Sequence, residues 1–588
     1  MEIILYFNKL KFRSRIIVLL SFIFFVQCGS EDSIDSAKKK LLNKDGGQLN
    51  EDLQSLAAEF FNWRSATQPA AGDDIPRVER PDKWVPDYSQ EALLEIKTKY
   101  KEFIIRLEEI PKQNWHVSDS VDYLILRSAV ERVNWEFTVL NAPSRNPDFY
   151  VQQTLGAVFE LLLISTPMTE QRATNVIARL NSFSQTVEDA KTNLTQPVAS
   201  FSDIALGNLE NIRKKLEATN DALMPLFPER LHEELGHASE SAIKALEDYA
   251  IWLKMKHPGM TNDFSVGKEA YEYFLDNIAL IPYSPEELLK QGELEWNRSV
   301  LLEEFEQLRN SKLPEATLFA TVEEQLSRAK IEEENIRVFL EENDIMTVPE
   351  SLSHYLSVKI PPHLAPLAYM GVMDDLTSES RLKETAVRYI PEPSPYLPYF
   401  SLSSAQDPRP LIIHEGVPGH YFQMALSWSN PDPIRRRFID SGANEGIGFY
   451  VEEMMLQFGL FDDKPRSREI IYSFMRLRAL RVEVDIRLAV GEFDIEEAGE
   501  YLEKKVPLDK ETAIDEAGFF AYNPGQAISY QIGKLQITKF LSDAKIMKGD
   551  EFDLRKFHDY LMLNGNVPIA LLRWEYLGLR DEIEQFFN

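Results

Sequence analysis

The chain has 588 residues, of which 44% are apolar and 27% charged, a composition typical of a large folded protein and not of a disordered or membrane-embedded one. Its 94 acidic and 64 basic residues give a net charge of −30, which argues against nucleic-acid binding because that requires a cationic surface. A single cysteine excludes an internal disulfide and a CxxC metal knuckle. The chemistry must therefore depend on a few residues, among them nine histidines.

The N-terminus has the pattern of an export signal. Basic residues precede an apolar run from Ile16 to Val26, which is shorter than the roughly 20 residues needed to span a bilayer. Cys28 follows almost at once, as at the processing site of a bacterial lipoprotein, although a glutamine replaces the small residue usual before that cysteine. The alternative is an ordinary cleaved signal with an incidental cysteine.

We expect a lipoprotein signal peptide over residues 1–27, lipid attachment at Cys28 and a flexible tether over residues 28–49, which are rich in Ser, Asp, Lys and Gly. The mature protein is then located in the bacterial cell envelope, periplasmic or surface-facing, and touches the membrane only through its lipid.

From residue 50 to residue 588 the pattern is helical. Segments such as ATVEEQLSRAKIEEENIRVFLEE (320–342) place apolar residues three and four apart, and Pro and Gly mark the breaks. Alternating strand patterns are scarce, and the best are near Ala386–Ile390 and Tyr399–Leu402. We predict a mainly α, bundle-like single catalytic unit with a deep cleft and at most a small β element near the site described next.

The most informative stretch is LIIHEGVPGHYFQ (411–423). It is similar to HExxH, in which two histidines one turn apart bind zinc and the glutamate activates water. Here His414 and His420 are six residues apart, which on a regular helix leaves their side chains about 120° out of line. Pro418 cannot continue a regular helix and the flanking glycines relax the backbone, so a local break is predicted to bring His420 back beside His414.

A second motif, NEGIGFYVEE (444–453), supplies carboxylates. Glu445 and Glu452 are seven residues apart and therefore share one helix face, while the intervening glycines permit close approach of another backbone. Two histidines and one glutamate, with a fourth position open to water, are a common catalytic zinc arrangement. We predict Zn²⁺ held by His414, His420 and Glu445, with Glu452 orienting a ligand imidazole.

HEGVPGHYFQ, EGIGFYVEE and NPGQAISYQIG (523–533) occur in this order. With them the chain resembles the bacterial domain-of-unknown-function 885 family, from about residue 50 to the C-terminus. Its members carry HE-x-x-PGH-x-x-Q, EG-x-x-x-Y-x-E and PGQA-x-x-Y-x-x-G. The resemblance implies a mainly helical fold similar to zinc metallopeptidases with a glutamate third ligand (gluzincins). It places His414, His420 and Glu445 at the metal positions and Glu415 at the general base.

The third motif implies further site residues. Tyr530 matches its tyrosine, whose hydroxyl could hydrogen-bond the oxyanion of a tetrahedral intermediate. Gln526 and Tyr522 lie near it in the sequence, and with Gln423 they are expected to orient ligands or bind substrate. Without the resemblance, PGQAISY reads equally well as the start of a helix.

One departure from the family pattern bears on substrate binding. Members usually read R-x-x-x-D-x-G-x-H after an arginine-rich helix, whereas this chain has Arg487 and Ala489 in place of the Gly and the His. If that His binds substrate or stabilises the transition state, specificity is altered or the rate reduced. The metal positions themselves are intact.

Two functions follow. The first is an exported zinc-dependent hydrolase, a metallopeptidase for peptide or peptide-like substrates, in which Glu415 takes the proton of a metal-activated water. The alternative is a non-catalytic or degenerate surface binding lipoprotein on the same scaffold, which the missing histidine favours and the retained Glu415 opposes.

Two other clusters are interpreted as structural. His232 and His237, five residues apart in HEELGH, are misaligned on a helix, so we expect no metal there. The run Arg435–Arg437 is expected to be a solvated helix face, or to contact a substrate carboxylate if it lies at the rim of the cleft.

Overall fold

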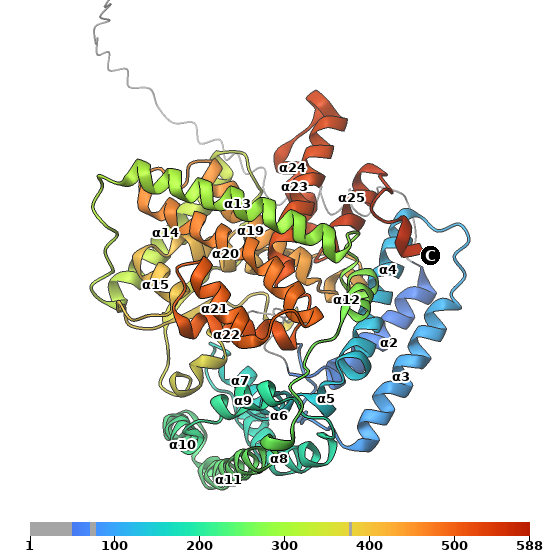
Figure 1. Ribbon diagram of the computed structural model, residues 1–588, viewed down its shortest axis with the longest axis vertical. Coiled ribbons are helices and arrows are strands. Elements are labelled where there is room, and N and C mark those ends of the chain that lie inside the picture. The colour runs from blue at the N-terminus through green and yellow to red at the C-terminus, as the bar shows by residue number, and fades with distance from the viewer. Residues whose placement is uncertain (1–49, 71–77, 375–378, 588) are drawn as a thin grey trace, which may run out of the picture.

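The computed structural model describes residues 50–70, 78–374 and 379–587 (Figure 1). The expected signal peptide, Cys28 and the tether over residues 28–49 lie outside these described residues. Within them the protein is mainly helical with one small sheet, which confirms the predicted fold class. None of the described helices is long and apolar enough to cross a membrane.

Several helices of the first half begin where a polar side chain accepts a hydrogen bond from the first turn. Asn50, Ser89 and Thr169 cap α2, α3 and α8 in this way. Figure 1 shows α2 to α4 along one side of the molecule and α8 to α11 at one end. The α-helices of this half are α2 (Glu51–Thr67), α3 (Gln90–Glu108), α4 (Val117–Asn134), α5 (Ala142–Arg145), α6 (Pro147–Val151), α7 (Ala157–Leu162), α8 (Glu170–Asn193), α9 (Ala199–Asn208), α10 (Ile212–Leu223), α11 (His232–Lys256), α12 (Lys268–Phe274), α13 (Pro285–Asn310) and α14 (Val322–Glu342).

The sheet has the strand order β1-β3-β2. Strands β1 (Tyr355–Lys359) and β3 (Ala386–Ile390) are parallel, and the two-residue β2 (Met373–Asp374) pairs antiparallel with β3. The strand predicted at Ala386–Ile390 is therefore confirmed. The side chain of its central residue, Arg388, reaches the candidate site described below.

The second predicted strand, Tyr399–Leu402, is wrong, because these residues begin helix α15 (Tyr399–Gln406). A carboxylate oxygen of Asp509 accepts the backbone N–H of Tyr399 at 3.1 Å, which satisfies a free donor at the helix start. The rings of Tyr399 and Phe400 both pack against Phe474 on α20. Tertiary packing on one helix face thus overrides the short alternating pattern.

The second half of the chain builds the centre of the molecule and its C-terminal end. Helix α13 packs along α20, and α19 packs along α23. The α-helices of this half are α15 (Tyr399–Gln406), α16 (Arg409–Leu411), α17 (His420–Ser427), α18 (Pro433–Arg437), α19 (Ser441–Gln457), α20 (Pro465–Val490), α21 (Ile495–Lys505), α22 (Lys510–Tyr522), α23 (Ile528–Lys548), α24 (Leu554–Leu563) and α25 (Ile569–Leu577).

Glycines allow the backbones of α19 and α23 to touch. A Cβ added at Gly533 would lie 2.0 Å from the carbonyl oxygen of Gly442 and 2.7 Å from the Cα of Gly446, closer than any real contact. The second and third sequence motifs therefore meet as paired small-residue helix faces. The PGQA residues form the turn that precedes α23, and the helix itself begins at Ile528.

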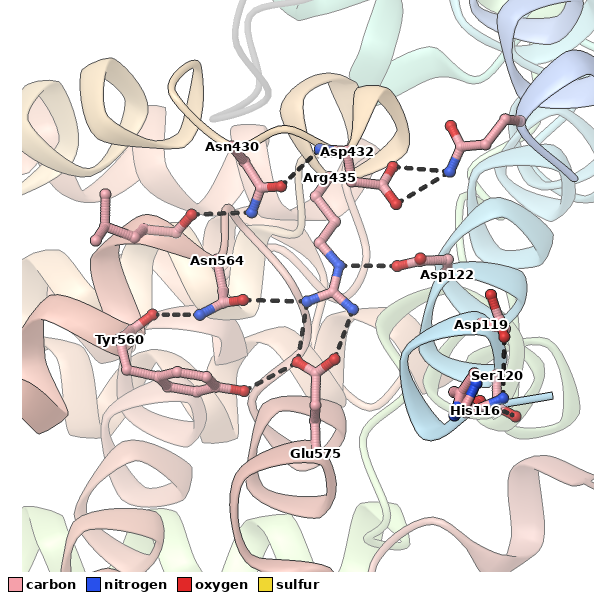
Figure 2. Close-up of polar contacts among 12 residues, drawn as sticks. His116, Asp119, Ser120, Asp122, Asn430, Asp432, Arg435, Tyr560, Asn564 and Glu575 are labelled. Carbon is pink, nitrogen blue, oxygen red and sulfur yellow. Dashed lines mark hydrogen bonds and ion pairs between the residues drawn. The ribbon is translucent and has the colours of Figure 1, made fainter. Parts of the chain in front are cut away.

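Arg435 is buried, which corrects the expectation of a solvated arginine face. Its guanidinium donates to Asp122 on α4 at 2.8 Å and to both carboxylate oxygens of Glu575 on α25 (Figure 2). Asn564 accepts a further bond at 3.1 Å. These partners lie far from Arg435 in the sequence, so no local pattern could reveal them. Arg437, by contrast, is exposed as expected.

Candidate metal centre

The backbone between the two histidines breaks where the sequence predicts. A π-helical turn, Ile412–Gly416, carries His414 and ends before Val417, which is extended. Helix α17 then starts at His420. The two imidazole rings end 4.6 Å apart between centroids at an angle of 78°, and both residues are buried. The predicted meeting of His414 and His420 is therefore observed.

One donor atom from each of His414, Glu415 and His420 lies within 4.8 Å of the others, so this group could hold a metal ion. Among the described residues it is the only cluster of three or more His, Cys, Asp or Glu side chains with such spacing. His232 and His237 are not part of one. The side chain of His237 is 81% exposed, and the ring of His232 contacts the Phe227 carbonyl.

The Glu445 carboxylate on α19 also faces both imidazoles. Its Oε2 lies 3.4 Å from Nε2 of His414 and 3.3 Å from Nε2 of His420, yet this buried oxygen accepts no hydrogen bond among the described residues. Ligand atoms at 2.0–2.1 Å from a tetrahedral zinc ion are about 3.3–3.4 Å apart. The spacing and the unsatisfied oxygen therefore fit a shared cation better than they fit direct hydrogen bonding.

Glu452 holds the other nitrogen of His414. Its Oε1 lies 2.7 Å from Nδ1 of His414 and 2.9 Å from the Arg478 guanidinium on α20. A carboxylate in this position favours a proton on Nδ1 and leaves Nε2 directed toward Glu445 and His420. Both Glu452 and Arg478 are buried, so each charge is balanced by the other.

The ionisation of the cluster follows from these contacts. Burial and Arg478 both act to lower the pKa of His414, but the neighbouring carboxylates of Glu445 and Glu452 outweigh them and raise it to about 9. Burial acts to raise the pKa of Glu445, and the adjacent imidazoles of His420 and His414 nevertheless bring it well below its usual value. The site therefore keeps a full negative charge on Glu445 in a buried environment.

Glu415 differs from the two histidines of the group in burial, because it is only partly buried. The Arg388 guanidinium on β3 donates to its Oε1 at 3.2 Å. The small sheet therefore orients the carboxylate of this group, which is partly exposed to solvent. This agrees with the predicted β element near the site.

Tyr530 on α23 lies over the site. Its ring is nearly parallel to that of His414, with an interplanar angle of 13° and centroids 6.2 Å apart. On α20, the Arg481 guanidinium lies 4.5 Å and that of Arg478 5.6 Å from the centroid of the Tyr530 ring. The contact between α19 and α23 thus brings the third motif to the first two.

The remaining predicted residues are placed differently. Gln423 is fully buried on α17, and its amide atoms have no hydrogen-bond partner in the described part of the chain. Gln526 accepts a 3.4 Å bond from Ser441, the first residue of α19, and so joins the turn before α23 to that helix. Tyr522 packs edge-on against Phe201 and Phe519, in an apolar cluster. Its predicted role at the site stays a prediction.

Comparison with known proteins identifies the family of this chain. The family model described as "Bacterial protein of unknown function (DUF885)" matches residues 67–575, most of the chain. The chain belongs to this family. No curated protein matches it.

Two solved structures show the same fold. One is a candidate lipoprotein of unknown function from Shewanella oneidensis, with 16% identity, a TM-score of 0.69, and coverage of 90% of this chain and 100% of that one. The other is a candidate lipoprotein from Colwellia psychrerythraea, with 16% identity, a TM-score of 0.72, and coverage of 89% and 98%. At this identity the likeness extends to the fold alone.

Ala489, the residue at which the chain departs from the DUF885 pattern, lies in an apolar environment. Ala489 is buried in a cluster with Phe274, Ile278 and Ile528, and its carbonyl accepts the backbone N–H groups of the two residues before α12. One turn earlier, Asp485 accepts bonds from the backbone N–H groups of residues 525 and 527 at 2.8 and 2.6 Å. This aspartate thus shapes the turn that leads to α23 and its tyrosine.

Sequence reasoning about this DUF885 chain missed three arginines. Arg388 lies within a strand pattern and Arg478 on an arginine-rich helix. Arg481 matches the arginine of the family's R-x-x-x-D pattern, but the pattern alone assigns it no place at the site. A usable signal existed on α20, since Arg478, Arg481 and Asp485 recur three and four residues apart. That spacing places all three on the face of α20 that turns toward the site.

Proposed function

We propose that this DUF885 protein is an exported zinc-dependent hydrolase, a metallopeptidase acting on peptide or peptide-like substrates. The observation that carries the proposal is the unsatisfied, buried Glu445 oxygen that faces two imidazole nitrogens at the ligand spacing of a tetrahedral ion. Glu415, a carboxylate of suitable chemistry, stands directly beside it. The deep cleft predicted to admit substrate stays a prediction.

In this proposal Nε2 of His414, Nε2 of His420 and Oε2 of Glu445 hold the ion, a nitrogen-and-oxygen donor set that suits zinc. When bound, zinc polarises a carbonyl group and lowers the pKa of a coordinated water to about 7. Glu452 and Arg478 keep His414 in the tautomer that offers Nε2.

The protein's own groups then move the proton and stabilise charge. Glu415, oriented by Arg388, accepts a proton from the attacking water and delivers it to the leaving amine. The Tyr530 hydroxyl donates a hydrogen bond to the oxyanion that forms on the substrate carbonyl. Its ring is held in place by contacts with His414 and with the guanidinium of Arg481.

Metal analysis and turnover of three variants test the proposal. Wild-type protein should contain about one zinc per chain, and the double variant His414→Ala, His420→Ala should lose it. Glu415→Gln should keep the zinc while hydrolysis of a peptide library falls about 10²–10⁴-fold, the usual contribution of a general base. Glu233→Gln, whose side chain is 91% exposed, is the control and should change neither quantity.

The same measurements separate the alternatives. Turnover by Glu415→Gln at the wild-type rate contradicts the proposed mechanism. Zinc-loaded wild-type protein that cleaves no peptide or ester in the library favours the non-catalytic binding lipoprotein instead. Zinc that survives loss of both histidines contradicts the ligand assignment.

The proposal of export includes a lipid anchor at Cys28, which the likeness to two candidate lipoproteins supports at the level of fold. In bacterial cells grown with a labelled fatty acid, wild-type protein should incorporate label and Cys28→Ala should not, because Cys28 is the single thiol of the chain. Ser30→Ala, two residues further on, leaves the thiol in place and serves as the neighbouring control. Labelling of Cys28→Ala at the wild-type level contradicts the anchor.

A further inference from the structure

A cavity of about 410 Å³ lies apart from the metal centre, between α2, α4, α17 and the residues around α18. This volume is within the range of small-molecule sites, about 300–1,000 Å³. None of His414, Glu415, His420 and Glu445 lines it. The cavity shares α17 with the metal centre, since Met424 in its wall comes one turn after His420, but it offers a separate set of side chains.

The charge of its lining is opposite to that of the protein. The charged side chains that line it are five guanidinium groups and one carboxylate: Arg64, Arg80, Arg132, Arg436, Arg437 and Glu79. The chain as a whole carries a net charge of −30. A concentration of like charge around a partly enclosed space is unfavourable unless an anion compensates it, and it attracts anions from solution.

Neighbouring carboxylates contact two of these guanidinium groups. Glu136 pairs with Arg64, and Glu160 lies 3.6 Å from Arg80. Arg437 contacts a neutral group, the amide oxygen of Asn62, at 3.4 Å. Within the lining itself the guanidinium groups outnumber the carboxylates.

Two of these arginines also keep unused donors. Arg64 is 5% exposed, and its Nη1 has no acceptor among the described residues. The same holds, within that part of the chain, for Nε of Arg80. A buried guanidinium donor without an acceptor is costly, and an oxyanion is the acceptor that such forks bind best.

Apolar groups complete the lining. The rings of Phe60, Phe61, Trp428 and Phe438 take part in it, together with the side chain of Met424. A simple inorganic ion would leave this aromatic surface and most of the volume unused. The shape and chemistry suit a molecule with an anionic head and an apolar body.

We propose that this cavity binds a small organic oxyanion, a carboxylate or phosphate monoester carried on an apolar or aromatic group. The arginines take the oxyanion through charge-assisted hydrogen bonds, and the rings take the apolar body. The site is independent of the proposed hydrolase, because its residues and those of the metal centre are different.

Calorimetric titration with matched ligands tests the proposal. N-acetylphenylalanine, its uncharged amide and phenyl phosphate are titrated into EDTA-treated protein and into the His414→Ala, His420→Ala variant, so that no metal can take the anion. Both anions should bind, and the amide should bind at least about tenfold more weakly than the acid because it lacks the charge. Raising the salt concentration should weaken binding of the two anions and should not change binding of the amide.

The double variant Arg132→Gln, Arg437→Gln should bind both anions at least about tenfold more weakly than wild type. Its circular-dichroism spectrum should stay that of wild type. Arg230→Gln, an exposed arginine outside the cavity, is the matched control and should bind as wild type does. Equal affinity for acid and amide, wild-type affinity in the double arginine variant, or no binding of either anion overturns the proposal. Because the readout needs no turnover, it stands or fails separately from the hydrolase.

Discussion

The imidazole of His414 is constrained at both ring nitrogens. Nε2 faces Glu445, and Nδ1 faces Glu452, which is itself held by Arg478. Glu452 is 0% exposed, so its charge is balanced only by these buried neighbours. Removing one partner of such a buried pair leaves the other uncompensated, which is far more damaging than losing an exposed ion pair. The geometry of the candidate metal centre therefore depends on Glu452, whose side chain contacts the outer nitrogen of His414.

Glu452→Gln should weaken zinc binding about 10- to 100-fold, as loss of an outer carboxylate on a ligand histidine typically does. It should also lower the melting temperature, because Arg478 loses its buried anion. Competition with a chromogenic chelator measures the first effect and calorimetric melting the second. The exposed Glu233→Gln should leave both unchanged, and a Glu452→Gln protein with wild-type zinc affinity would argue that His414 is held by other contacts.

At the scale of elements, α19 supplies both the carboxylate proposed as the third metal ligand and the surface against which the imidazoles lie. A Cβ added at Gly448 would come within 2.8 Å of Cε1 of His420 and 2.9 Å of Cε1 of His414. Gly448 lies between Glu445 and Glu452 along the helix. The absence of a side chain there lets both rings approach the helix closely enough for its two carboxylates to reach them.

Gly448→Ala should therefore displace both imidazoles and weaken zinc binding at least about tenfold, although alanine itself favours a helix by about 0.5–1 kcal/mol over glycine. The matched control is Gly207→Ala in α9, where a new Cβ meets nothing within 4 Å. The control should bind zinc normally and melt at the same or a slightly higher temperature. Normal zinc affinity in Gly448→Ala would show that the rings can shift without cost.

At the scale of the whole molecule, His558 joins three distant segments. On α24, its Nδ1 contacts the carbonyl of Ile345 after α14, and its Nε2 contacts the Tyr450 hydroxyl on α19, both at 2.8 Å. Burial lowers the pKa of His558 from 6.5 to about 4, against a smaller opposing effect of the Ile345 carbonyl. Tyr450 is thus a packing and bridging residue.

The lowered pKa predicts how stability changes with acidity. Between pH 6.5 and 4 the unfolded chain binds a proton at His558 and the folded protein does not, so this group's contribution is present at neutral pH and is lost as the pH falls. Over that range the loss is about 3 kcal/mol. Calorimetric melting of wild type and His558→Gln at several pH values should show their difference in melting temperature shrinking as the pH falls.

Comparing two proteins is necessary because other buried groups act in the opposite direction. Burial raises the pKa of Asp485 to about 6 and that of Asp440 to about 7. Between their unfolded pKa near 3.8 and these values the folded state holds more protons, so their contribution is lost as the pH rises. These effects are common to wild type and His558→Gln and cancel in the difference. A difference that does not change with pH would contradict the assignment to His558.

Much of the site was predictable because its information is local. The pair His414 and His420, the break between them and the shared face of Glu445 and Glu452 follow from helix geometry over short spacings. The helical fold and the strand Ala386–Ile390 follow from periodicity in the same way. Local rules failed at α15, where contacts with α20 decided the structure.

By itself the sequence determined which residue types stand close along the chain: the two imidazoles, the carboxylates and the glycines that thin α19. Only the tertiary structure decided which distant groups surround them. Arg478, Arg388 and Tyr530 reach the site, and Arg435 is buried among α4, α18 and α25, through contacts between segments far apart in the chain. Such contacts carry no period along the sequence, because they arise when helices bury their faces against one another and must pair every charge they enclose.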